Sequence, residues 1–156
     1  MAVNTLKRLV TQAPVLAFYD PKKPVELAVD ASQHGLGAMM SQDRKPIEFA
    51  SRSLTDCETG YTNIEKEMLA VVFCVEHFHY YIYGRPITVE SDHKPLEAII
   101  KKSFFSTPPR LHLRMMKYDV TLKNKAGQKM YVLDTLSRIL LATQQRPASD
   151  ERPKCI

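Results

Sequence analysis

Alternation of apolar and polar residues along the chain predicts five β-strands. In residues 25–32, Val25, Leu27 and Val29 alternate with less apolar neighbours, which is the two-residue period of a strand. The first three strands follow one another closely, with turns at residues 34–37 and 43–44, and therefore predict an antiparallel meander. The remaining predicted strands are residues 38–42, 45–51, 86–91 and 118–124.

The apolar period lengthens to three and four residues from Asn63 onwards, which predicts a helix of about five turns that ends near Gly84. The polar residues 55–62 are expected to form a loop. A strand–helix–strand crossover within one mixed sheet places the chain in the α/β class, with helices on the faces of the sheet. Shorter helices are predicted for residues 93–100, 110–117 and 131–143.

A length of 156 residues favours a single domain with one sizeable core. Prolines at positions 14, 21 and 24 mark residues 1–24 as a linker or N-terminal extension, with a short amphipathic helix at residues 3–12. The predicted domain is residues 25–143. Residues 144–156 are polar and contain prolines, so we expect a disordered tail.

Composition excludes several classes of protein. No run of about 18 apolar residues exists that could span a membrane, and the N-terminus has no signal-peptide pattern. Three widely spaced cysteines without a CxxC pair argue against a zinc site or a disulfide framework. We therefore expect an intracellular protein, cytoplasmic or nuclear. The net charge of +5 suits a polyanionic partner, although many basic proteins bind no nucleic acid.

Two aspartates stand at the ends of predicted strands. Asp30 follows the alternating residues 25–29, and Asp92 follows the strand of residues 86–91. Aspartate is depleted in strands, yet strand ends pass into turns, where aspartate is common. Each of the two, taken alone, is better explained by a turn than by a functional site.

Glu67 is harder to explain by folding alone. In the predicted helix it shares a row with Ile64, Val71 and Cys74, so its carboxylate is expected to face the sheet. Burying a lone carboxylate costs several kcal/mol, whereas the helix dipole returns only about 0.3–1 kcal/mol. Asp134, at the start of the last predicted helix, has by contrast the ordinary explanation of a helix N-cap.

These four carboxylates are more informative together. Two neighbouring strand ends and two helix starts can meet at one edge of a sheet, where like charges repel unless cations bind between them. Carboxylate oxygens without a histidine or cysteine cluster favour Mg²⁺ or Mn²⁺ over Zn²⁺. Two such ions about 4 Å apart would support hydrolysis of a phosphodiester.

Five blocks of the sequence resemble, in order, one known family. They include the motifs VDAS, IEKEMLA and SDHKPL, each of which alone would be weak. Over about residues 6–138 the chain is similar to the ribonuclease H (RNase H) domain of gypsy-type LTR-retrotransposon polyproteins. The blocks are residues 13–42, 45–55, 61–72, 79–99 and 134–138.

The resemblance implies an RNase H-like fold: a five-stranded mixed sheet, with three antiparallel strands followed by parallel strands, flanked by helices. It also implies hydrolysis of the RNA strand of RNA/DNA hybrids, and the reverse transcriptase domain of the same polyprotein as a partner. The implied catalytic site holds two Mg²⁺ or Mn²⁺ ions on Asp30, Glu67, Asp92 and Asp134.

The resemblance further places Ser32 and Asn63 near the hybrid, although Asn63 is explained equally well as a helix cap. A group of basic residues follows the fourth predicted strand. These residues are available for phosphate contacts, but a merely solvated basic face is the slightly better explanation. They are Lys101, Lys102, Arg110, Arg114 and Lys117.

The chain also departs from its relatives. The segment after Pro109 is about three residues shorter, close to one helical turn, so Asp134 is expected to be the least well placed of the four carboxylates. Met130 and Leu133 replace a frequent Asn and a small Ala, and the histidine that cellular and retroviral members place near the last carboxylate is absent.

Two functions remain open. The first is an active metal-dependent endonuclease, which the four retained carboxylates favour, because a pure scaffold has no need to bury charge. The second is a catalytically weak or inactive RNase H-fold module that binds nucleic acid or protein, which the shortened segment favours. A generic nucleic-acid-binding domain would explain the charge but not Glu67.

Overall fold

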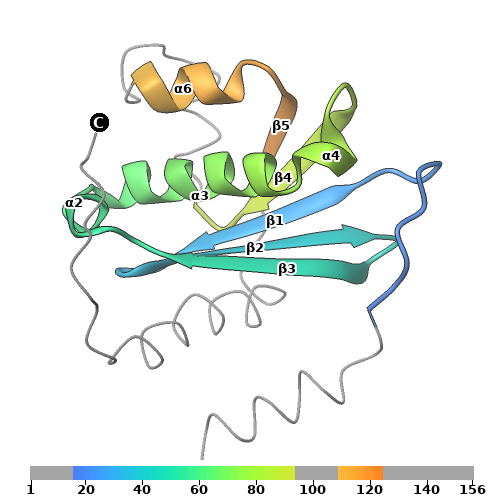
Figure 1. Cartoon of the computed structure of the whole chain (residues 1–156), viewed down its shortest axis with the longest axis horizontal. Helices are drawn as coiled ribbons and strands as arrows, with labels where there is room; N and C mark the ends of the chain where they lie inside the picture. Colours follow the sequence, from blue (N-terminus) through green and yellow to red (C-terminus); the bar gives the residue numbers. More distant parts are fainter. Residues whose placement is uncertain (1–15, 94–108, 125–156) are drawn as a thin grey trace, which may run out of the picture.

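The computed structural model describes residues 16–93 and 109–124, which form a five-stranded sheet of strand order β3-β2-β1-β4-β5 (Figure 1). The first three strands are antiparallel neighbours, whereas β4 runs parallel to β1 and β5 parallel to β4. The predicted α/β class and mixed sheet are therefore confirmed. The strands are β1 (Glu26–Ala31), β2 (Gly35–Gln42), β3 (Lys45–Ser53), β4 (Pro86–Ser91) and β5 (Asp119–Asn124).

The described helices lie on one side of this sheet, with α3 across β1 and β2 and α6 beside α3 (Figure 1). The long helix predicted from Asn63 is interrupted, because α3 ends at His77 and the short α4 follows it. After α4, Gly84 adopts a positive φ of 74° that favours glycine. The helices are α2 (Asp56–Thr59), α3 (Asn63–His77), α4 (His79–Ile82) and α6 (Pro109–Met115).

Two local predictions are wrong. The polar loop expected at residues 55–62 contains α2, which begins with a capping box: the Thr55 side chain accepts from the Glu58 amide, and the Glu58 carboxylate accepts from the Thr55 amide. The turn expected at residues 34–37 lies earlier in the chain. Gly37 is already part of the sheet, where it pairs with both neighbouring strands. The turn at residues 43–44 is confirmed, with positive φ at both positions, as tight hairpins require.

The hydrophobic core fills the space between the sheet and α3. Leu27 and Val29 of β1 are buried in one hydrophobic cluster with Val71 and Val75 of α3. Leu111 and Met115 of α6 complete the core from the far side of α3. Because α3 packs on both β1 and β2, its buried side chains face the sheet.

Residues 17–23, part of the segment predicted as a linker, are bound to the sheet. The Ala17 amide donates to the Pro46 carbonyl oxygen at 2.9 Å. Gln42, only 4% exposed, accepts from the Asp20 amide and donates to the carbonyl oxygens of Asp20 and Lys23. This part of the chain therefore has a fixed course beside β2 and β3.

Several predictions fall wholly or almost wholly outside the described residues: the helices at residues 3–12, 93–100 (of which only His93 is described) and 131–143, and the tail at residues 144–156. In the described part of the chain, none of the helices is long and apolar enough to cross a membrane.

Candidate metal centre

The parallel pairing of β1 and β4 places two aspartates at the same level of the sheet. Ala28 of β1 lies opposite Glu90 of β4. Two residues after Ala28 comes Asp30, near the end of β1, and two residues after Glu90 comes Asp92, directly after β4. Because parallel strands point the same way, both carboxylates reach the edge formed by the carboxyl ends of the strands.

Glu67 reaches this edge from the helix. Thr62 caps α3 through a capping box with Glu65, and this cap fixes where the helix begins. Glu67 follows in the second turn, on the inner face, and is 7% exposed. The prediction that it points toward the sheet is therefore confirmed, while Glu65 serves the cap.

The structure brings these three carboxylates together. One carboxylate oxygen each from Asp30, Glu67 and Asp92 lies within 4.8 Å of the others. Asp30 and Glu67 are buried, whereas Asp92 is exposed. The cluster is thus open to solvent on the Asp92 side, where a substrate could approach.

Such a cluster raises the pKa of Glu67 to about 8. Burial is the largest cause, followed by the negative charges of Asp30 and Asp92. Without a cation at the site, Glu67 is therefore largely protonated at neutral pH. A bound cation would favour the ionised carboxylate and would therefore lower the pKa of Glu67.

Two further groups orient Glu67, and the sequence analysis missed both. Its carboxylate accepts hydrogen bonds from the Ala31 amide and from the Ser91 hydroxyl, which oppose the rise of its pKa. Ser91 is 3% exposed, and its oxygen also accepts from the His93 amide at 3.2 Å. Ser91 thus fixes the turn that carries Asp92. A small polar residue directly before a strand-end aspartate was the available signal.

The donor set fits a hard divalent cation. The Glu67 Oε2 atom is buried and has no hydrogen-bond partner among the described residues, which is costly unless a cation accepts its lone pairs. The three ligand atoms are all carboxylate oxygens, the type preferred by Mg²⁺ and Mn²⁺. Within residues 16–93 and 109–124, no histidine or cysteine joins this cluster.

The remaining predicted site residues have different outcomes. Asp134 lies outside the described residues, as do Met130 and Leu133, so its expected misplacement stays a prediction. The Ser32 hydroxyl takes part in the β1–β2 turn, accepting from the Gly35 amide at 3.0 Å. Asn63 is exposed and is not the helix cap, because Thr62 has that role.

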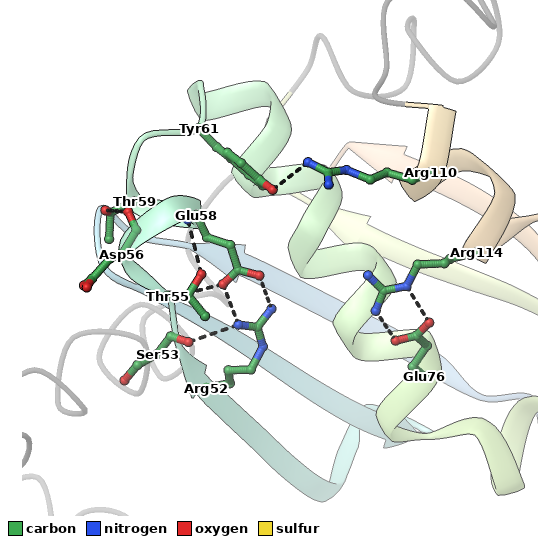
Figure 2. A network of polar contacts seen from close by, with 10 residues as sticks. All are labelled: Arg52, Ser53, Thr55, Asp56, Glu58, Thr59, Tyr61, Glu76, Arg110 and Arg114. Carbon is green, nitrogen blue, oxygen red and sulfur yellow. Dashed lines mark hydrogen bonds and ion pairs between the residues drawn. The ribbon is translucent and has the colours of Figure 1, made fainter. Parts of the chain in front are cut away.

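The two arginines of α6 face α3 (Figure 2). Arg114 binds both carboxylate oxygens of Glu76, at 2.8 and 2.5 Å. Arg110 donates to the Tyr61 hydroxyl at 3.0 Å. Arg114 is therefore engaged in holding α6 on α3, while Arg110 lies near the beginning of α3, the same end that carries Glu67. Lys101 and Lys102 lie outside the described residues.

Comparison with known proteins identifies relatives of the same kind as the sequence resemblance. The family model described as "RNase H-like domain found in reverse transcriptase" matches residues 1–89. Pol polyproteins of the Drosophila melanogaster transposons 297, opus and gypsy are 38%, 39% and 34% identical over 88%, 87% and 91% of this chain. The chain spans only 13–14% of the length of these polyproteins.

Solved structures agree on the fold. RNase H1 from Halobacterium salinarum NRC-1 superposes with a TM-score of 0.62 at 12% identity, covering 77% of this chain and 98% of that one. The foamy viral protease–reverse transcriptase in complex with RNA/DNA hybrid gives a TM-score of 0.58 at 19% identity, covering 99% of this chain and 21% of that one.

Proposed function

This chain belongs to the RNase H-like domain family found in reverse transcriptase, and from this premise we propose that it is a metal-dependent endonuclease that cleaves the RNA strand of RNA/DNA hybrids. The observation that carries the proposal is the meeting of Asp30, Glu67 and Asp92 within 4.8 Å at one edge of the sheet. Burying like charges together weakens a fold. The arrangement is therefore explained by a cation-binding function.

In this proposal Asp30, Glu67 and Asp92 hold two Mg²⁺ or Mn²⁺ ions, with Asp134 as the fourth ligand. When bound, such ions activate a water molecule and stabilise the leaving oxygen of the phosphodiester. Glu67 is held in place for this role by the Ala31 amide and the Ser91 hydroxyl. Asp92, the exposed member of the cluster, marks the side from which the scissile phosphate enters.

Recognition of the hybrid is assigned to groups beside this opening. Asn63 is exposed at the first position of α3, one turn before Glu67, and its amide suits contacts to 2′-hydroxyls in the minor groove. Arg110, near the same end of α3, suits a phosphate. Ser32 is the weaker candidate, because its hydroxyl already takes part in a turn.

The partner proposed for the chain is the reverse transcriptase part of a retrotransposon polyprotein. The relatives are Pol polyproteins, of which the chain matches a small part. The foamy viral structure with a similar fold contains a protease–reverse transcriptase bound to RNA/DNA hybrid. These observations support the partner and the substrate class together.

The test is a cleavage assay on hybrid with labelled RNA, with Mg²⁺, with Mn²⁺ and with EDTA. We expect cleavage of the RNA strand only when a divalent ion is present, and no cleavage of the matching DNA duplex. Asp30→Asn should abolish it, while Asp119→Asn, at an exposed position at the start of β5, should not. A chain that binds hybrid without cutting it under any metal condition would instead be a non-catalytic RNase H-fold module.

A further inference from the structure

Lys66, the residue before Glu67, is buried. Only 7% of its surface is exposed, although lysine is almost never buried without a partner. Its Nζ atom donates a hydrogen bond of 3.3 Å to the carbonyl oxygen of Gln33. The side chain thus runs from the beginning of α3 to the turn that leaves β1.

That turn begins directly after the strand that carries Asp30. The Ser32 amide donates to the Gly35 carbonyl oxygen at 2.8 Å, which closes the turn on itself. The Leu54 amide, which follows β3, donates to the His34 carbonyl oxygen at 2.8 Å. The Gln33 carbonyl is the point at which α3 holds the turn.

Two adjacent residues of α3, Lys66 and Glu67, therefore contact the backbone at the end of β1 and in the turn that follows it. Glu67 accepts from the Ala31 amide, and Lys66 donates to the Gln33 carbonyl two residues later. We propose that Lys66 is a positioning residue of the metal site: it fixes the end of β1, and with it Asp30, at the separation from Glu67 that shared ions require. The proposal rests on the function proposed above and deepens it.

A different role for Lys66 would be a direct contact to a substrate phosphate. That role requires an ammonium group exposed to the incoming strand. Lys66 is buried instead, and its ammonium is directed at a backbone carbonyl. The contacts therefore favour a positioning role for Lys66 inside the protein. Positioning and a phosphate contact predict different kinetics.

Three variants of the full chain separate these roles. Lys66→Met keeps an apolar stem of similar length without the charged donor, Lys66→Arg keeps the charge and donors, and Lys45→Met is a control at an exposed lysine. Each is compared with the wild type for Mn²⁺ affinity by calorimetry without substrate, for kcat and KM on hybrid, and for amide hydrogen exchange at Ser32 and Gly35.

We expect Lys66→Met to weaken Mn²⁺ binding about tenfold, the effect of losing one hydrogen bond from a charged donor. Its kcat should fall while KM for the hybrid stays unchanged, and exchange at Ser32 and Gly35 should accelerate. Lys66→Arg should restore most of the Mn²⁺ affinity. Lys45→Met should match the wild type throughout.

Several outcomes would overturn the proposal. A higher KM with unchanged Mn²⁺ affinity would assign Lys66 to a phosphate contact, and unchanged values in every measurement would show that it positions nothing. If Lys66→Met does not fold, Lys66→Gln, which keeps a shorter donor, is measured in the same way. A wild type that binds Mn²⁺ but cuts no hybrid would refute the proposed function alone, whereas one that binds no Mn²⁺ would refute both.

Discussion

Two glutamates of the same helix show how differently the two ends of α3 are built. Glu67, near its beginning, is buried beside two aspartates, and its pKa is raised to about 8. Glu76, near its end, binds Arg114 through both oxygens, and this bond lowers its pKa. The first arrangement weakens the fold unless a cation binds, whereas the second joins α6 to α3 (Figure 2). This difference distinguishes Glu67, a candidate metal ligand, from Glu76, a structural contact.

Glu58 resembles Glu76, because it also binds an arginine, Arg52, through both carboxylate oxygens. Arg52 reaches both oxygens of Glu58, at 2.7 and 3.2 Å, and also contacts the ring of Phe73 on α3. It thereby links β3 to α2 and α3. Glu58 and Glu76 thus each have a guanidinium partner, which joins two elements of the fold.

The largest effect is expected from Glu67→Gln, which removes the charge and keeps the shape. Cleavage of hybrid should fall about 10³-fold or more, because the ion ligand is lost. In EDTA at pH 8 the variant should be more stable than the wild type by about 1–3 kcal/mol, since a buried carboxylate no longer needs to ionise. The cleavage assay tests the predicted loss of activity, and urea unfolding tests the predicted gain of stability.

Glu76→Gln is the matched control, because it is the same substitution on the same helix. It should leave cleavage unchanged and lower stability slightly. If Glu67→Gln lowered stability in the same way, the contrast between the two ends of α3 would be wrong.

Asp92→Asn should also abolish cleavage, and its melting temperature without metal should rise. The rise should be smaller than for Glu67→Gln, because Asp92 is exposed and its repulsion is screened by solvent. Calorimetry in EDTA gives the melting temperatures. A variant that cuts hybrid at the normal rate would exclude Asp92 from the site.

Dependence of stability on pH should have opposite signs for the two glutamates. The pKa of Glu67 is raised in the folded state from 4.5 to about 8, so the folded state binds the extra proton, and metal-free stability falls as the pH rises through this window. The pKa of Glu76 is lowered, so its contribution is present above the unfolded value and is lost as the pH falls through the folded one.

Urea unfolding in EDTA between pH 4 and pH 9 measures this dependence. The fall of stability toward pH 8 should be absent in Glu67→Gln and present in Glu76→Gln. An identical fall in both variants would trace the effect to another group.

The smallest effect is expected from the two arginines of α6. Arg114→Met should lower stability by about 0.5–1 kcal/mol, as for a partly exposed bidentate pair, and leave KM for the hybrid unchanged. Arg110→Met should instead raise KM and reduce the salt dependence of binding. Equal effects of both substitutions on KM would show that α6 as a whole contacts the substrate.

Much of the site could be predicted from sequence because it depends on periodicity. The row of Glu67 follows from helical spacing, and Asp30 and Asp92 meet because two parallel strands end at one edge. Lys66 and Ser91 could not be found this way, because their roles depend on which loop lies opposite. The ion pair of Arg114 could not be found either, because the sequence does not show that Glu76 lies within its reach.

The most direct test of the central claim is a crystal of the protein soaked with Mn²⁺ and measured for anomalous scattering. The account predicts an anomalous peak between Asp30, Glu67 and Asp92, about 2–2.5 Å from their carboxylate oxygens, and no such peak in Glu67→Gln. A map without a peak at this edge at saturating Mn²⁺, or one with its peaks elsewhere, would contradict the claim that the carboxylate cluster is a metal site.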